Sequence, residues 1–381
     1  MLLKFHTPEV LFGIGSMAEA GYAAVRLGAR RPMVVTDPGL MEAGWPTELA
    51  GHLLDVGLLP VLWHELTPNP KDREIRAGYQ TYLEHECDVL IALGGGSCMD
   101  AAKGVAVLAG NGGDILDYRG VDKMTRAIPP LIAIPATSGT GADVSQFCIV
   151  TDTTRSVKVT IMSRALVPDL SITDPRLLTT MPDWLNAASG LDALTHATEA
   201  FVSRAHNPLT DIHALSAARL VFDNLQHAME RRTGDAVREN MALASLDAGL
   251  AFSNAILGAT HAMSHQVGGL LDAPHGVING ILLPHVIRYN AKSAADRFRD
   301  LAVAAGVCPV STPSQDATEL LALRVRKLAD DVGVPAGLRS LGVTDPQCDF
   351  LAESTFQDAC LTTNPRKAER REIAELFRAA L

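Results

Sequence analysis

The chain has 381 residues, 47% of them hydrophobic and 20% charged, which suits a protein of about two globular domains. A net charge of −10 and a pI near 5.6 argue against a nucleic-acid partner. The sequence lacks both an N-terminal signal core and an 18-residue apolar run, so we expect a cytoplasmic protein without a membrane partner. Its six scattered cysteines form no CxxC pair, which favours reduced thiols.

Short buried strands alternate with helices up to about residue 175. Strands are expected at 32–37, 59–64, 88–93 and 131–135, and helices at 18–27, at 44–56 and from the 67–70 loop to residue 87. This alternation predicts a parallel sheet with helices on both faces, which is the doubly wound, Rossmann-like α/β architecture.

Asp37 closes the predicted strand 32–37. In doubly wound folds, an acid at the carboxyl end of a strand is where the ribose of a dinucleotide binds. An aspartate that caps a helix or fixes a turn would look the same in this stretch, so both interpretations stay open.

A glycine turn follows strand 88–93, the clearest buried strand in the chain. Gly95, Gly96 and Ser97 lead into a helix that carries Asp100. Glycines let backbone N–H groups approach a pyrophosphate, and a helix N-terminus adds positive partial charge, so the turn predicts a phosphate cradle. The alternative is a tight strand-to-helix turn that holds no ligand.

A second polar loop, 136–141, follows the strand 131–135. Its hydroxyl residues Thr137, Ser138 and Thr140 suit hydrogen bonds to phosphates or to a ring amide. Lys158 is either a further cation for the same ligand or a solvated surface lysine.

The character of the sequence changes near Pro182. Ala- and Leu-rich helices are expected at 183–203, 208–229, 235–258 and 260–270, with several more from 279 onward. We therefore expect an α/β dinucleotide-binding domain over 1–181 and an all-helical domain over 182–381.

Eight of the twelve histidines lie between His196 and His285, which points to a metal or proton-transfer site. Asp192 and His196 are four residues apart, as are His261 and His265, so each pair would share a helix face. His275 follows in an Ala-Pro-His-Gly turn that should interrupt the helix. Spacing alone would make both His261 and His265 ligands, and ordinary core or surface histidines are the alternative.

Several motifs together resemble the iron-activated (group III) alcohol dehydrogenases, along essentially the whole chain. They are Gly94–Ser97, Ala136–Gly141, Gly190–His196, His261–His265, Pro274–Gly276 and Thr363–Arg366. The resemblance implies a nucleotide-binding α/β domain, a helical metal-binding domain and catalysis in the cleft between them.

The resemblance also implies roles for individual residues. Asp192, His196, His261 and His275 would bind the metal, whereas His265 would stay unligated beside the nicotinamide and the substrate. The implied cofactor-binding positions are Asn69, Gly95, Gly96, Ser97, Thr137, Ser138, Thr140 and Lys158. Asp37 and Asp100 join the predicted cofactor-binding residues from their places in the sequence. Phe147, Phe252 and Cys360 match substrate-pocket positions or are plain core. Phe147 stands where some diol-using relatives have a polar residue, so small unbranched primary alcohols are expected to outcompete diols and sugars.

The expected function is that of an NAD-dependent alcohol dehydrogenase or aldehyde reductase that acts on a small alcohol or aldehyde. The expected metal is Fe²⁺, with Zn²⁺ or another divalent ion as alternatives. The protein is expected to be a homodimer or a larger homo-oligomer. The alternatives are a dehydroquinate-synthase-like lyase and a zinc polyol dehydrogenase of the same fold. No Lys or Arg occurs from Asp247 to Ile287, which disfavours a phosphorylated substrate. A non-catalytic nucleotide or metal sensor is disfavoured because every expected ligand is present.

Overall fold

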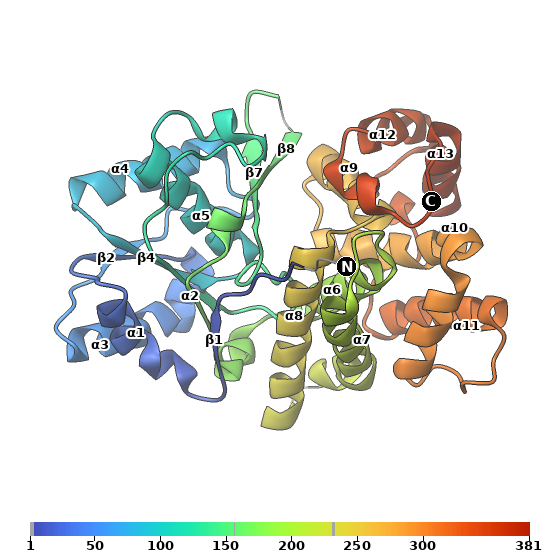
Figure 1. Cartoon of the computed structure of the whole chain (residues 1–381), viewed down its shortest axis with the longest axis horizontal. Coiled ribbons are helices and arrows are strands. Elements are labelled where there is room, and N and C mark those ends of the chain that lie inside the picture. Colours follow the sequence, from blue (N-terminus) through green and yellow to red (C-terminus); the bar gives the residue numbers. More distant parts are fainter. Residues whose placement is uncertain (1–3, 156, 231–232) are drawn as a thin grey trace. The chain divides into compact units, whose positions relative to one another are not determined.

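The computed structural model describes residues 4–155, 157–230 and 233–381, and the chain divides into two compact units (Figure 1). One unit comprises His6–Met181, and the other comprises Pro182–Leu381 with the N-terminal residues Lys4 and Phe5. Phe5 belongs with the second unit because its ring stacks on His213, with 5.6 Å between ring centroids.

The first unit is built on a six-stranded sheet whose neighbouring strands are all parallel. In spatial order its strands are β1 (Glu9–Phe12), β9 (Leu170–Thr173), β6 (Leu131–Pro135), β4 (Val89–Gly94), β2 (Pro32–Val35) and β3 (Val61–Trp63). The predicted parallel, doubly wound sheet is therefore confirmed.

Helices cover both faces of this sheet. They are α1 (Ala20–Arg26), α2 (Pro38–Ala43), α3 (Trp45–Asp55), α4 (Asp72–Glu84) and α5 (Gly96–Asn111), with 3-10 turns η1 (Ser16–Glu19), η2 (Ile115–Tyr118), η3 (Arg164–Leu166) and η4 (Pro175–Thr180). Successive side chains of a strand point to opposite faces. Thus Leu90 and Ala92 of β4 pack with α4 and α5, whereas Ile91 and Leu93 pack with α1 and α3.

A smaller sheet of β5 (Gly120–Val121), β8 (Val157–Met162) and β7 (Phe147–Asp152) was not predicted. Strands β7 and β8 form an antiparallel hairpin, with Phe147 opposite Met162. The connection between them reads Thr-Thr-Arg-Ser, which lacks the Asn-Gly or Asp-Gly pair that marks a tight hairpin turn.

The strand order reverses between β2 and β4, because β3 lies beyond β2 while β6 and β9 lie beyond β4. In open α/β sheets, ligands bind at the carboxyl ends of the strands that flank such a reversal. Asp37 follows β2 and the turn Gly94–Ser97 follows β4, so the topology brings both predicted cofactor elements to the same edge.

The second unit is helical. Its elements are α6 (Asp183–Val202), α7 (Pro208–Ala228), α8 (Asp235–Ala255), α9 (Ala259–Leu271), α10 (His275–Ala304), α11 (Ser314–Asp331), α12 (Cys348–Thr355) and α13 (Arg370–Ala379), with 3-10 turns η5 (Leu338–Leu341), η6 (Asp345–Gln347) and η7 (Ala359–Thr363). The predicted interruption before His275 is confirmed by the break between α9 and α10. Within the described ranges no single helix has the length and apolar character to cross a membrane, and one bent pair, α8 with α9, meets that test by length and composition.

Candidate metal centre and cofactor cradle

Asp192, His196, His261 and His275 converge on one point in the helical unit. Helix α6 carries the first two, α9 carries His261, and His275 begins α10. Asp192 Oδ1 lies 3.9 Å from His196 Nε2, 3.7 Å from His261 Nε2 and 3.8 Å from His275 Nε2. One carboxylate oxygen thus faces three imidazole nitrogens at nearly equal distances.

This donor set fits a divalent metal. Four ligands at about 2.0–2.2 Å from an ion in tetrahedral geometry lie about 3.3–3.6 Å from one another, close to the separations at Asp192. One carboxylate and three imidazoles suit Fe²⁺ or Zn²⁺. Asp192, His196 and His261 are buried, and burial without a partner ion would be costly for so many polar groups.

The electrostatics of the cluster favour an ionised Asp192. Burial raises its pKa, but the charge of His196 and the hydrogen bond with His261 outweigh burial and hold the pKa below its ordinary value. Burial lowers the pKa of His261, but the carboxylates of Asp192 and Glu199 outweigh it and raise the pKa to about 9. The site therefore attracts positive charge.

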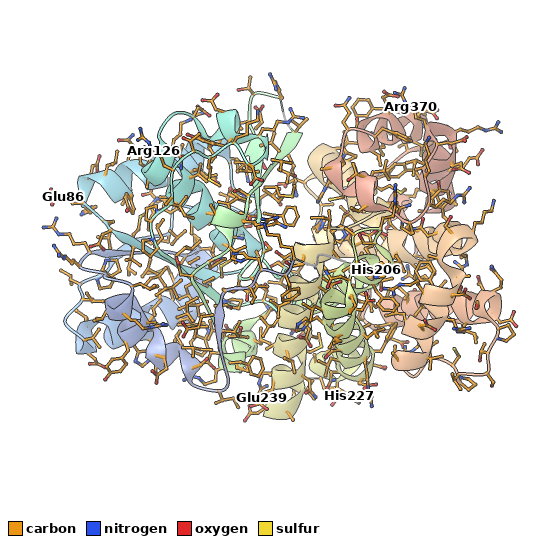
Figure 2. All side chains as sticks on the ribbon, viewed as in Figure 1. Glu86, Arg126, His206, His227, Glu239 and Arg370 are labelled. Atoms are coloured by element: carbon orange, nitrogen blue, oxygen red, sulfur yellow. The ribbon has the colours of Figure 1, made fainter. Side chains whose placement is uncertain are left out.

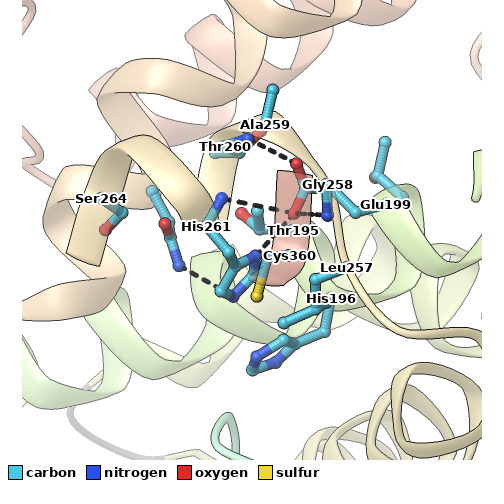
Figure 3. A network of polar contacts seen from close by, with 12 residues as sticks. Thr195, His196, Glu199, Leu257, Gly258, Ala259, Thr260, His261, Ser264 and Cys360 are labelled. Atoms are coloured by element: carbon cyan, nitrogen blue, oxygen red, sulfur yellow. Dashed lines mark hydrogen bonds and ion pairs between the residues drawn. The ribbon is translucent and has the colours of Figure 1, made fainter. Parts of the chain in front are cut away.

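Glu199 contacts His261 on the side of the ring opposite the nitrogen that faces Asp192, and so orients it (Figure 3). Its Oε2 accepts a hydrogen bond from His261 Nδ1 at 2.7 Å, which leaves Nε2 for the metal. Its carboxylate also accepts from the backbone N–H groups of Gly258 at 3.0 Å and Thr260 at 2.6 Å, at the start of α9. We did not predict Glu199, although it follows Asp192 by seven residues, two helical turns along the same face.

The other two imidazoles are also fixed. Ser264 Oγ lies 3.1 Å from His275 Nδ1, so the Nε2 of His275 can face Asp192. The ring of Phe252 stacks on the ring of His196 with 4.3 Å between centroids. Phe252 therefore packs directly against a predicted ligand.

Two glycines let α10 approach α6. A Cβ on Gly276 would lie 1.9 Å from the carbonyl oxygen of Ala188, and one on Gly280 would lie 2.7 Å from Leu191 Cδ1. The clash at Gly276 is with backbone and cannot be relieved without moving a helix, so this position requires glycine, whereas a shift of the Leu191 side chain could relieve the clash at Gly280. The close approach brings His275 within reach of Asp192.

His265 lies beside the ligand cluster and belongs to a second group of contacts. Its ring stacks on His275 with 5.3 Å between centroids. Its Nδ1 lies 2.8 Å from Asp358 Oδ2, and the other carboxylate oxygen of Asp358 accepts from the Cys360 N–H at 2.9 Å. Asp358 therefore joins His265 to Cys360, and the three side chains together could hold a proton or a metal ion. We did not predict Asp358.

The remaining histidines of the rich region do not join the cluster. His206, His213 and His227 each contact a nearby acid. His206 and His227 are exposed, and Figure 2 shows His227 at the lower edge of the view. With His285, these three make four of the eight histidines between His196 and His285 that lie outside the group formed by the four converging residues and His265.

In the first unit, the glycine turn packs against the loop 136–141. A Cβ on Gly95 would lie 3.2 Å from Thr137 Cγ2, and one on Gly96 would lie 3.1 Å from Thr140 Cγ2. Among the described residues, the buried hydroxyls of Thr137 and Ser138 have no hydrogen-bond partner. A glycine-lined turn beside unsatisfied hydroxyls at a helix N-terminus fits the pyrophosphate of a dinucleotide.

Asn69, Ser97 and Lys158 meet beside this cradle. The backbone N–H of Asn69 donates to Ser97 Oγ at 3.1 Å, and Lys158 Nζ donates to Asn69 Oδ1 at 2.8 Å. Asn69 has a φ of 57°, which asparagine tolerates better than most residues. Lys158 thus contacts another predicted cofactor residue and is half-buried.

Asp37 caps helix α2 by accepting from the Leu40 N–H at 3.0 Å, while its Oδ2 lies 3.3 Å from Cys98 Sγ. The capping interpretation is thus seen directly, and it leaves the ribose interpretation untested.

Asp100 lies one turn into α5 and is half-buried. Burial raises its pKa to about 7, although the positive charge of Lys103 acts to lower it.

Lys103 is fully buried and holds the loop that follows 136–141. Its Nζ donates to the carbonyl oxygens of Ala142 at 2.6 Å, Ser145 at 2.7 Å and Phe147 at 2.9 Å. We did not predict Lys103, although it follows Asp100 on α5.

The three residues predicted to line a substrate pocket belong to different units. Phe147 begins β7 in the first unit, whereas Phe252 and Cys360 belong to the second and are buried.

Comparison with known proteins gives matches along the chain. Residues 7–175 match the family described as iron-containing alcohol dehydrogenase, and 186–381 match the C-terminal part of the Fe-containing alcohol dehydrogenase family. The 1,3-propanediol dehydrogenase of Citrobacter freundii is 41% identical, covering 100% of this chain and 99% of its own. The NAD-dependent methanol dehydrogenase of Bacillus methanolicus is 34% identical, covering 99% of each.

Solved structures agree with these matches. A crystal structure of 1,3-propanediol oxidoreductase superimposes with a TM-score of 0.97 at 38% identity, covering 100% of both chains. The sulfoacetaldehyde reductase of Bifidobacterium kashiwanohense, solved in complex with NAD⁺, gives a TM-score of 0.89 at 28% identity, covering 100% of this chain and 99% of the other.

Proposed function

The chain belongs to the iron-containing alcohol dehydrogenase family, and from this premise we propose that it interconverts a small primary alcohol and its aldehyde, with NAD as the hydride carrier. The observation that carries the proposal is the convergence of three imidazole nitrogens on Asp192 Oδ1 at 3.7–3.9 Å. When bound, a divalent metal polarises the alcohol oxygen and NAD accepts the hydride.

Different residues are proposed to bind the metal, bind the dinucleotide and transfer the proton. Asp192, His196, His261 and His275 hold the metal, and Glu199 fixes the tautomer of His261. Residues 1–181 bind the dinucleotide through the glycine turn Gly95–Ser97, the hydroxyls of Thr137, Ser138 and Thr140, and the group formed by Asn69 and Lys158. Residues 182–381 carry the metal and the proton-transfer group.

His265 transfers the proton. Its Nδ1 donates to Asp358 Oδ2 at 2.8 Å, so Nε2 is the nitrogen that can take a proton from the alcohol and release it to solvent. Its ring is partly exposed, with 15% of the side-chain surface open. Asp358 stabilises the imidazolium that forms, as a buried carboxylate does for a general base.

Asp37 sets the preference for NAD, since its carboxylate would bind the ribose hydroxyls and repel a 2′-phosphate. We expect Asp37→Gly to raise the kcat/KM for NADP relative to NAD by about 10- to 100-fold, because a like-charge clash is removed. Asp37→Asn keeps a good cap for α2 without the charge, so it should shift the preference in the same direction with little change in Tm. Unchanged ratios in both variants would show that Asp37 only caps the helix.

Asp100 should make NAD binding depend on pH. With its pKa near 7, the carboxyl is neutral below that pH and ionised above it, and the ionised form adds a negative charge four residues into α5, the helix whose N-terminus is proposed to hold the pyrophosphate. We expect the Kd for NAD⁺ to rise by about three- to tenfold between pH 6 and pH 8. Fluorescence titration would measure it, with Asp100→Asn as the control that should give a flat profile. A flat profile in the unchanged chain would contradict this placement of Asp100.

The substrate is proposed to be unbranched and largely apolar beyond its reacting hydroxyl, because Phe252 and Cys360 are buried near the predicted metal ligands. A second hydroxyl buried without a partner costs about 1–3 kcal/mol. A terminal diol is the second candidate, favoured by the 41% identity to a 1,3-propanediol dehydrogenase. Comparing kcat/KM for 1-propanol, 1,3-propanediol and 1,2-propanediol decides between them.

The test of the function itself is direct. Iron-loaded protein mixed with NAD⁺ and a primary alcohol should produce the near-ultraviolet absorption of reduced nicotinamide. Absence of that signal with every alcohol, and of its reversal with the aldehydes, would refute the proposal.

We further propose that the protein is a cytoplasmic homodimer or larger homo-oligomer. The family resemblance supports the oligomer, and six free, buried cysteines support a reducing compartment. Sedimentation velocity should give at least twice the mass of one chain, 40.5 kDa.

A further inference from the structure

Asn279 lies among the four predicted metal ligands. It follows His275 by one turn of α10, and its side chain is fully buried. Its Nδ2 lies 2.7 Å from Asp192 Oδ1, 3.1 Å from His275 Nε2 and 3.3 Å from His261 Nε2. One amide thus contacts donor atoms from three helices, α6, α9 and α10.

The orientation of the amide follows from chemistry. An ionised carboxylate can only accept hydrogen bonds, so the atom 2.7 Å from Asp192 Oδ1 must be the amide nitrogen. The oxygen that accepts from Asn279 is the same oxygen that faces the three imidazoles. Asn279 therefore acts on the predicted ligand atom of Asp192 itself.

The hydrogen bonding of the Asn279 side chain differs from that of an ordinary buried asparagine. Among the described residues, the buried Asn279 Oδ1 has no hydrogen-bond partner, which costs about 1–3 kcal/mol. Asn290, on the same helix, forms a reciprocal amide pair with Asn364 at 2.9 and 2.8 Å. The helix thus has one buried asparagine that is fully paired and another that is half-paired and aimed at the ligand atoms.

The sequence around His275 repeats with the period of one helical turn. His275-Gly276 is followed four residues later by Asn279-Gly280. The glycines let α10 pack closely on α6, against Ala188 and Leu191. The polar member of each pair then reaches Asp192, at 3.8 Å from His275 and 2.7 Å from Asn279.

We propose that Asn279 is a positioning residue of the metal site, whose amide holds the Asp192 carboxylate so that it presents a single oxygen, Oδ1, to the metal. The inference rests on the proposed function, since it assumes that Asp192 is a ligand. A carboxylate restrained in this way gives the ion four protein donor atoms and leaves a position for the substrate oxygen. Without the amide, the carboxylate is free to rotate and bind through both oxygens.

The test uses Co²⁺ as a probe on the full chain freed of metal by chelation, because the visible absorption of Co²⁺ is strong with four ligands and weak with five or six. The variant is Asn279→Leu, which has nearly the same size and no donor. We expect its Kd for Co²⁺ to rise by about 10- to 100-fold, the usual effect of losing a group that orients a ligand. Its absorption per bound ion should also fall.

Asn224→Leu is the matched control. Asn224 is a buried amide that donates to Leu220 O and accepts from Asn240, away from the ligands. It should keep the affinity and the spectrum of the unchanged chain. Equal losses in both variants, or an unaltered spectrum in Asn279→Leu, would overturn the proposal. Circular dichroism checks folding, and Asn279→Ala carries the same expectation if the leucine variant does not fold.

The experiment tests the proposed metal site and the proposed role of Asn279 separately. If the unchanged chain binds no Co²⁺, the proposed metal site is wrong. If it binds Co²⁺, loses binding in His275→Ala and keeps both affinity and spectrum in Asn279→Leu, the metal site stands and the role of Asn279 is refuted.

Discussion

Replacing His275 with alanine is expected to remove the metal and the activity together while the chain stays folded. Structural zinc sites with four ligands bind with about 10–16 kcal/mol, so one ligand accounts for roughly 3 kcal/mol, on the order of 100-fold in affinity. His275 opens α10 and is partly exposed, so its loss leaves the core packing of that helix in place. Metal analysis of the purified variant, its turnover and its Tm would be measured together.

The control for that variant is His285→Ala. His285 lies on the same helix but outside the ligand cluster, so metal content and turnover should match those of the unchanged chain. Retention of one tightly bound ion by His275→Ala would contradict its assignment as a ligand. Loss of metal from both variants would mean that damage to α10, rather than a missing donor atom, explains the result.

Replacing His265 with alanine is expected to give the opposite combination, with metal retained and turnover reduced. General acid–base groups contribute about 10²- to 10⁴-fold, so kcat for alcohol oxidation should fall by at least about 100-fold. His265 lies one turn past His261, outside the group formed by Asp192, His261 and His275, and the contact of its Nδ1 with Asp358 leaves its Nε2 to move a proton. Steady-state kinetics and metal analysis on the same sample would measure both effects.

Asp358→Asn provides the matched comparison for His265. The amide keeps the size of the side chain but removes the charge that stabilises protonated His265, so kcat should fall by less than in His265→Ala, with metal content unchanged. Loss of metal in His265→Ala would make His265 a ligand and overturn the assignment. Full turnover in His265→Ala would show that another group accepts the proton.

The sequence was sufficient for the main architecture because the strands of a parallel sheet are short apolar runs that alternate with helices. Strand β4, for example, is buried along its whole length and is followed at once by the glycine turn. The hairpin of β7 and β8 was missed because its turn lacks glycine and asparagine. Hydrophobic alternation alone does not tell an antiparallel hairpin from two strands of a parallel sheet.

Asp192, His196, His261 and His275 were predicted as metal ligands from their match to the family's motifs, whereas spacing alone would have added His265. The structure brings these four residues together. The residues that orient them were not predicted. Glu199 reaches His261 across 62 positions of sequence, Asp358 reaches His265 across 93, and Asn279 reaches Asp192 across 87. Such pairings depend on how helices pack, through contacts such as Gly276 on Ala188, and no local pattern encodes them.

The central claim is that one divalent ion, held by Asp192, His196, His261 and His275, is required for NAD-dependent alcohol oxidation. The most direct measurement is to strip the protein with a chelator, add Fe²⁺ stepwise without oxygen, and follow the formation of reduced nicotinamide. We predict no activity before the addition, a linear rise, and a plateau at one ion per chain. Full activity in the stripped protein, unaltered by added metal, would contradict the account.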